Sequence, residues 1–269
     1  MRSQRLGRIL FAALLLISAA ASSFTQTNDN GDRVSTSSNS SSSGIQPPPP
    51  TYQFPYDETY VYAADWRIWT GGTVTITMTP GTVSATADSI GFVSLLYPVH
   101  DKFKSIFDPK TYCSQSINKH TEEGFHARDT LITFNYGLRK SVLDETNLKK
   151  KETKRVENDI PGCVTDVLTG IYYVGSLPLQ SGGSYKFPIN DGNKTVEVEA
   201  KVEARETVKV PAGTFKTVRV SPVTSGTLNS RGKLWIWYSD DSRRIPVQMR
   251  GRFLWGTITF QLQRIDKKQ

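Results

Sequence analysis

The chain has 269 residues, of which 10% are aromatic and 37% hydrophobic, enough for one large folded domain or two small ones. The formal net charge of +8 falls to about +5 without the three arginines of the N-terminal segment, and without an obvious basic face this favours an ordinary charged surface. The aromatic residues alternate with Thr and Glu rather than with Arg and Lys, so nucleic-acid binding is not expected.

The N-terminus has the pattern of a secretory signal peptide over residues 1–23. Three arginines, the last at Arg8, precede the apolar run Ile9–Ile17, and small residues follow it. A membrane anchor is the weaker alternative, because the run is well short of the roughly 20 residues that span a bilayer. We expect export, cleavage between Ala21 and Ser23, and a periplasmic or secreted mature chain without a transmembrane span. No Cys follows the run to carry a lipid anchor.

Residues 24–50 form a region poor in apolar side chains. The serine-rich run Ser35–Ser43 is followed by four prolines, Pro47–Pro50. Such a segment buries too little apolar surface to compensate for its ordering, so we expect a disordered linker that ends in a stiff spacer. A proline-rich ligand for a recognition domain is the weaker alternative. Residues 51–269 then form a single β-rich domain.

The domain opens with alternating segments typical of strands. Aromatic residues recur at even positions from Tyr52 to Trp66, and Val74, Ile76 and Met78 alternate with threonines before a Pro-Gly turn. Each segment therefore has one apolar face. Further strands are expected at Val83–Ala87, Ser114–Glu123 and Phe125–Tyr136.

Residues 138–158 are strongly charged, with Lys149–Arg155 at their centre. We interpret them as a solvated hairpin or edge strand, because exposed lysines discourage aggregation between sheets. An anion-binding patch is the alternative.

One helix is indicated in the segment Cys163–Val174. Val164, Leu168 and Ile171 recur at spacings of three and four, which predicts a broad apolar helix face. That face needs a large surface to pack against, and the concave side of the sheet is the candidate.

The ends of this helix carry weaker signals. Gly162 or Thr165 is the candidate cap, and Asp166 lies in the first turn, where the helix dipole favours a negative charge. Gly175 follows the predicted end.

The most regular alternation lies in residues 196–210, with apolar side chains at even positions and mostly charged ones at odd positions. Pro211–Gly213 predicts a turn that brings Val218 and Val220 back beside Val208 and Val210. Other strands of this half are expected at Tyr185–Ile189, Leu234–Tyr238, Val247–Leu254 and Thr257–Arg264. The sequence thus predicts a mainly β fold: a curved antiparallel sheet, either a half-barrel or an open barrel, wrapped on one helix.

The strand at 234–238 has apolar side chains on both faces. Trp235 and Trp237 share one face and Leu234, Ile236 and Tyr238 the other, so both faces are expected to be covered. We favour core plus helix contact over core plus an aromatic-lined groove. The side chains expected to face a ligand or the core are Val164, Leu168, Ile171, Trp235 and Trp237.

Cys113 and Cys163 are the two cysteines of the chain. In an exported protein two such thiols most often pair, so we expect one disulfide. A metal site is the rival interpretation, but no close His or carboxylate pattern accompanies them.

Four motifs occur in the order found in a bacterial exported family: Glu206–Phe215, Asp166–Tyr173, Trp237–Val247 and Gly256–Leu262. The chain resembles domain of unknown function 3108 over most of residues 56–264. The resemblance implies an exported, curved antiparallel sheet with a helix in Gram-negative-type bacteria, and no established activity. That family often has Arg where this chain has Gly175, so no ligand role is expected there. The shape is also similar to that of periplasmic lipoprotein carriers, an analogy between folds.

A search for catalytic patterns finds no nucleophile elbow, phosphate-binding loop or zinc-protease motif. His120 and His126 can meet across a turn, but this is only a weak indication of a two-His metal site. Asp240 and Asp241, beside Arg243 and Arg244, resemble an acid/base pair with a substrate clamp, but a hairpin tip explains them more simply. We therefore expect no catalytic residues, metal or cofactor.

Two functions remain. The first is a non-enzymatic envelope protein that holds an apolar ligand, such as a lipid or lipoprotein acyl chain, in the concave sheet. The second is an interaction module that binds an envelope protein or polysaccharide. An enzyme ranks third.

Overall fold

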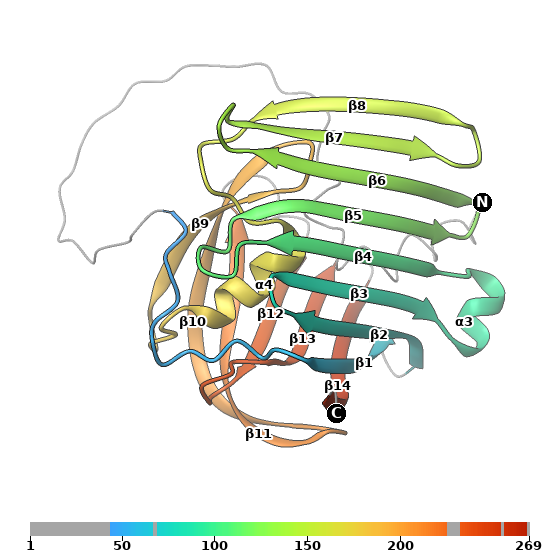
Figure 1. Cartoon of the computed structure of the whole chain (residues 1–269). Coiled ribbons are helices and arrows are strands. Elements are labelled where there is room, and N and C mark those ends of the chain that lie inside the picture. Colours follow the sequence, from blue (N-terminus) through green and yellow to red (C-terminus); the bar gives the residue numbers. More distant parts are fainter. Residues whose placement is uncertain (1–43, 67–68, 225–231, 254–255, 268–269) are drawn as a thin grey trace, which may run out of the picture.

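The computed structural model describes residues 44–66, 69–224, 232–253 and 256–267. Within them, 14 strands form one sheet in the order β8-β7-β6-β5-β4-β3-β2-β1-β14-β13-β12-β11-β10-β9, and each pair of neighbours is antiparallel. The sheet curls strongly without closing, and helix α4 lies in its concavity (Figure 1). The predicted fold class, an open barrel on a helix, is confirmed.

The elements have the following bounds. The strands are β1 Glu58–Trp66, β2 Trp69–Thr79, β3 Thr82–Ser89, β4 His100–Phe107, β5 Ser114–Glu123, β6 His126–Asn135, β7 Lys140–Asn147, β8 Glu152–Asp159, β9 Ser184–Asn190, β10 Thr195–Val210, β11 Gly213–Thr224, β12 Gly232–Ser239, β13 Pro246–Phe253 and β14 Gly256–Lys267. The helices are α3 Gly91–Leu96 and α4 Val167–Ser176. The charged segment 138–158 forms the β7–β8 hairpin, and β8 is an edge of the sheet, as predicted.

Helix α4 begins later than its apolar spacing indicates. Thr165 forms a parallel bridge with Ile189 of β9, which keeps the chain extended up to Asp166. Asp166 is the N-cap, so neither Gly162 nor Thr165 caps the helix. Val164 therefore precedes the helix. The second helix, α3, has no buried side chain, so no apolar stripe marks it in the sequence.

The β10–β11 hairpin has the predicted turn but not the predicted pairing. The two-residue turn places Gly213 opposite Val210. Val218 then lies opposite Arg205 and, after a bulge, Val220 lies opposite Val202. The expected pairing of Val218 and Val220 with Val208 and Val210 is wrong, because so tight a turn pairs the residues closest to it first.

The two edges of the sheet approach each other through the β9–β10 turn rather than through a ladder. The side-chain amide of Asn158 on β8 donates to the carbonyl of Gly192, at 2.9 Å. Gly192 has φ +94°, and a Cβ there would lie 2.6 Å from the side chain of Ile132 on β6. Only glycine permits this approach without distortion.

The concave side holds two apolar clusters. The larger one surrounds α4, whose Leu168, Tyr172, Tyr173 and Val174 are each no more than 3% exposed. The smaller one joins β5, β6 and β7 to the segment before α4. Around α4 the concave face is therefore filled by the protein's own side chains.

The predicted signal peptide lies outside the described residues, as does most of the predicted linker 24–50. The end of that linker packs on the domain. Gly44 donates its N–H to the carbonyl of Lys186, at 3.0 Å, and Gln46 donates its N–H to the Tyr173 hydroxyl, at 2.9 Å. The packed part of the chain thus includes residues 44–50, ahead of the expected boundary at Thr51. Among the described residues, no helix is long and apolar enough to cross a membrane.

Candidate ligand-binding pocket

Helix α4 is fixed at its N-terminus by the buried carboxylate of Asp166. One oxygen accepts the backbone N–H groups of Leu168 and Thr169, at 2.8 and 3.1 Å. The other accepts the hydroxyls of Ser105, Ser114 and Thr169. The side chain is 1% exposed, so strands β4 and β5 hold the helix start through a charged group shielded from water.

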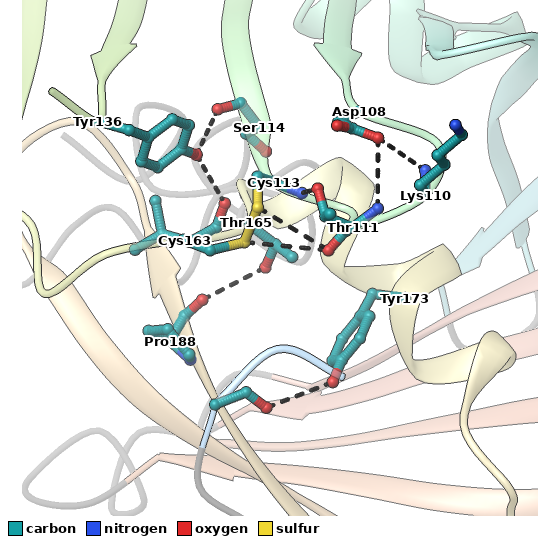
Figure 2. The surroundings of a disulfide bond; sticks show 12 residues. Asp108, Lys110, Thr111, Cys113, Ser114, Tyr136, Cys163, Thr165, Tyr173 and Pro188 are labelled. Carbon is teal, nitrogen blue, oxygen red and sulfur yellow. Dashed lines mark hydrogen bonds between the residues drawn. A yellow bond between two sulfur atoms is a disulfide. The ribbon is translucent and has the colours of Figure 1, made fainter. Parts of the chain in front are cut away.

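A disulfide lies beside this anchor. Cys113 of the β4–β5 connection is bonded to Cys163, with Cα atoms 5.1 Å apart, which confirms the predicted pair (Figure 2). The Tyr136 hydroxyl donates to the carbonyls of Ser114 and Val164, at 2.6 and 3.3 Å, on the same side (Figure 2). The segment before α4 is thus tied to β5 and β6. A disulfide is consistent with a location outside the cytoplasm.

A pocket of about 450 Å³ opens at the opposite end of α4. It is built from three parts of the chain: the packed N-terminal segment, the residues that end α4 and follow it, and the β12–β13 turn with Arg205 of β10. Its lining residues are Pro49, Thr51, Tyr52, Gly175, Ser176, Leu177, Pro178, Leu179, Gln180, Arg205, Asp241, Ser242 and Arg244.

The pocket has an apolar side and a charged side. Leu177 and Leu179 are buried, and together with Tyr52 and the prolines they form the apolar side. Arg205 and Arg244 form much of the charged side. This division suits a molecule with an apolar body and a polar end.

Ion pairs hold the charged side in place. Both Arg205 and Arg244 hydrogen-bond to Asp240, and the bond from Arg205 contributes most to lowering the pKa of that carboxyl. Arg205 also donates to the carbonyl of Leu179, at 3.0 Å. Asp241 accepts the N–H groups of Arg243 and Arg244 at 3.0 and 3.2 Å, as expected of a hairpin tip. The cations are therefore fixed as walls of the pocket by ion pairs and turn hydrogen bonds.

Gly175 is one of the residues that line the pocket. A Cβ at this position would stand 2.9 Å from the carbonyl oxygen of Arg244 and 3.2 Å from the ring of Tyr238. The Tyr238 hydroxyl donates to the carbonyl of Ile171, at 2.7 Å, and locks α4 against β12. Gly175 thus permits the close approach of α4 to the β12–β13 turn, a packing role.

The other residues singled out from the sequence lie apart from the pocket. Val164 belongs to the smaller apolar cluster, Leu168 to the larger, and Ile171 packs against the larger one. Trp237 is 6% exposed but lies on the outer face, where its indole N–H donates to Glu206 at 2.7 Å. Trp235 is half-buried and shares that outer face by strand alternation.

Two ionisable groups, the buried Asp101 and the half-buried Lys119, lie on the concave face of β4 and β5. Burial, and then the charge of Glu123, raises the pKa of Asp101 to about 8. Burial lowers the pKa of Lys119. Neither residue lines the pocket.

The weak two-His site is not formed. His120 is hydrogen-bonded to Asp129 and Glu122, at 2.6 and 3.2 Å. In the β5–β6 ladder, His126 lies opposite Glu123, and Glu123 is three residues from His120 along β5. Side chains an odd number of residues apart point to opposite faces, so the two rings lie on opposite faces of the sheet. Within the described part of the chain, no group of three metal-ligating side chains occurs.

Sequence reasoning missed the pocket because its residues come from segments far apart. The turn residues Asp241 and Arg244 carried a visible signal, but Leu177–Gln180 and Pro49–Tyr52 did not. Only the path of the chain across the end of α4 joins them.

A solved structure supports the fold. The chain is similar to the crystal structure of a β-barrel-like protein of domain of unknown function DUF1849 from Brucella abortus, with a TM-score of 0.55 and 8% identity, covering 79% of this chain and 98% of that one. It also aligns with an inferred exported protein of YmcC-like fold from Bacteroides fragilis, with a TM-score of 0.30 and 10% identity, covering 80% and 98% of the two chains. A comparison with curated proteins finds no match. The model of the family "Protein of unknown function (DUF3108)" matches residues 61–263, and the chain therefore belongs to this family.

Proposed function

We propose that this protein is a non-enzymatic, exported binding protein of the cell envelope, periplasmic or secreted, for an amphiphilic ligand such as a lipid or acyl chain. The observation that carries the proposal is the pocket at the end of α4, with its apolar side formed by Leu177 and Leu179 and its charged side formed by Arg205 and Arg244. Its volume of about 450 Å³ falls within the range of roughly 300–1,000 Å³ usual for small-molecule sites.

The ligand then lies outside the middle of the concave sheet, the position that the sequence alone predicts. Tyr172, Tyr173 and Val174 of α4 fill that space with side chains that are nearly inaccessible to water. A ligand there would have to displace packed core groups, whereas the pocket needs no such change. The disulfide supports export, because such bonds persist in oxidising compartments.

Binding is tested with a fluorescent fatty acid, and with mass spectrometry of lipids extracted from the protein purified from cell envelopes. Gln180→Trp places a bulky ring at an exposed lining position without removing a core side chain. Gln115→Trp, at an exposed position of β5 outside the pocket, is the matched control. We expect binding to weaken at least about tenfold in the first variant and to be unchanged in the second.

Two results would contradict the proposal. One is a wild-type protein that binds neither the probe nor a cellular lipid. The other is equal binding by wild-type protein and Gln180→Trp, which would place the ligand elsewhere. Capture of an envelope protein through the same residues would instead favour an interaction module.

A further inference from the structure

Large apolar side chains are exposed at one end of the barrel. Trp69 is 68% exposed, Phe92 72%, Leu95 81%, Leu96 63% and Phe125 84%. Scattered apolar residues are normal on a protein surface, but a contiguous group of this kind marks an interaction site.

These residues lie at or near the connections between neighbouring strands, and backbone hydrogen bonds join these connections to the chain beside them. The N–H of Ile90 donates to the carbonyl of Gly71 at 3.0 Å, which joins the start of β2 to α3. The N–H of Gly124 donates to Pro98 at 2.8 Å, and the N–H of Leu148 to Ala127 at 2.9 Å. Helix α3, the β5–β6 turn and the β7–β8 turn consequently lie together at one end of the sheet (Figure 1). We call the set formed by Trp69, residues 90–97, 124–126 and 148–151 the α3 end.

The α3 end is also basic. Lys149, Lys150 and Lys151 follow one another in the β7–β8 turn, and all three are exposed. The turn is held by Asn147, whose side-chain oxygen accepts the N–H groups of Lys149 and Lys150 at 3.1 and 3.0 Å. No ion pair engages these lysines within the described residues. The segments of the α3 end contain no Asp or Glu.

We propose that the α3 end docks on the surface of an anionic lipid bilayer. Phe92, Leu95 and Phe125 enter the boundary between headgroups and acyl chains. Burial of their apolar surface there provides favourable free energy of binding. Lys149–Lys151, in the turn joined to the β6 start beside Phe125, meet the lipid phosphates, which attract clusters of basic residues. A neutral apolar partner would satisfy the first group but not the second, so the charge favours a lipid surface.

This docking is independent of the ligand proposal. The pocket lies near Glu58, which begins β1 and pairs with Arg243 of the β12–β13 turn at 3.2 Å. The α3 end lies where β1 ends and β2 begins. The two sites are therefore at opposite ends of the strands, and either can fail without the other.

The test is flotation of the purified protein with phosphatidylcholine vesicles, with and without phosphatidylglycerol. We expect binding to the anionic vesicles, weakened but not abolished at about 1 M salt, where the Debye length is about 3 Å. The double variant Phe92→Ser/Leu95→Ser should lower the bound fraction, as should Lys149→Gln/Lys150→Gln/Lys151→Gln, each by at least about tenfold in partition coefficient.

Matched controls are available in the same chain. Leu138 is 71% exposed in the β6–β7 turn at the other end of the sheet, so Leu138→Ser should leave binding unchanged. Lys104, Lys110 and Lys216 are exposed outside the α3 end, and Lys216 adjoins the β12–β13 turn near the pocket, so their triple change to Gln removes the same charge elsewhere.

Three outcomes would overturn the proposal. The first is no binding to anionic vesicles. The second is an equal loss of vesicle binding in the lysine control, which would indicate general charge attraction. The third is a loss of self-association, rather than of lipid binding, in Phe92→Ser/Leu95→Ser, which would make a second copy of the chain the partner.

Discussion

Removing the carboxylate of Asp166 should be among the most damaging single changes in the domain. In Asp166→Ala, the N–H groups of Leu168 and Thr169 lose their acceptor at the start of α4. The hydroxyls of Ser105 and Ser114 also lose their acceptor. Asp166 is only 1% exposed, so water cannot take the place of its carboxylate. The perturbation thus removes a helix cap and unpairs buried polar groups at once.

The magnitude follows from these contacts. Loss of the cap costs about 1 kcal/mol. Each buried polar group left unpaired adds about 1–3 kcal/mol, although Ser105 and Thr169 can still pair with each other across 2.7 Å. We expect a total of about 3–5 kcal/mol, a large part of the roughly 5–15 kcal/mol that keeps a domain folded. Asp166→Asn keeps the capping oxygen and should cost about 1 kcal/mol.

Guanidinium denaturation followed by far-ultraviolet circular dichroism measures these differences. Asp108→Ala is the matched control, because Asp108 also accepts two backbone N–H groups, from Lys110 and Thr111 at 2.7 and 3.3 Å, but at an exposed turn. Asp108→Ala should lower the free energy of unfolding by about 1 kcal/mol or less. If Asp166→Ala is no more destabilising than Asp108→Ala, burial of the carboxylate is not what anchors the helix, and the reasoning fails.

Three further changes test other parts of the structure. The double variant Cys113→Ser/Cys163→Ser opens a loop with a sequence separation of 50 and should lose about 4 kcal/mol in the loop-entropy model, read from the denaturation midpoint; an unchanged midpoint would contradict this. Because the folded state holds the proton of Asp101 up to about pH 8 and the unfolded chain only to about pH 4, the stability it contributes is full below pH 4 and is lost as the pH rises to 8. Asp101→Asn should therefore be more stable than wild type above pH 8, and a pH series of thermal midpoints with the same slope in both proteins would exclude this account. Gly192→Ala should cost more than Gly182→Ala, since both have positive φ but only the first places a Cβ 2.6 Å from a buried isoleucine; equal thermal midpoints would rule out the clash.

Alternation along single segments predicted most strands of the sheet, but not β4, His100–Phe107. The even-numbered apolar residues of β10 follow from period-two burial. The β7–β8 hairpin was predicted from its run of charged residues, and β8 is exposed along most of its length. Both signals are local properties of the sequence. Register depends on turn geometry, and the tight turn before Gly213 moved Val218 and Val220 away from their expected partners. The helix start depended on a tertiary contact, the bridge from Thr165 to Ile189, which no local pattern records.

The candidate site was less accessible to sequence reasoning. Trp237 looked like a core or ligand-facing residue, yet it is covered on the outer face by Glu206 and by Arg250, whose guanidinium lies 5.5 Å from the ring centre. Charged side chains can bury an indole as effectively as a core can, because their aliphatic stems are apolar. Hydrophobicity alone therefore predicts that a tryptophan is buried, but not on which side of the sheet.

The two ends of α4 differ in how they are held, and this makes stability and binding separable. At its start, Asp166 and the Cys113–Cys163 bond fix the helix to β4 and β5. At its end, Gly175 packs against the β12–β13 turn, and Gln180 lies on the exposed rim of the pocket. Changes at the start should lower stability without a specific effect on ligand affinity, whereas changes on the rim should lower affinity at unchanged stability. A rim variant that instead unfolds the domain would indicate that the pocket is a packing defect of the helix end and not a binding site.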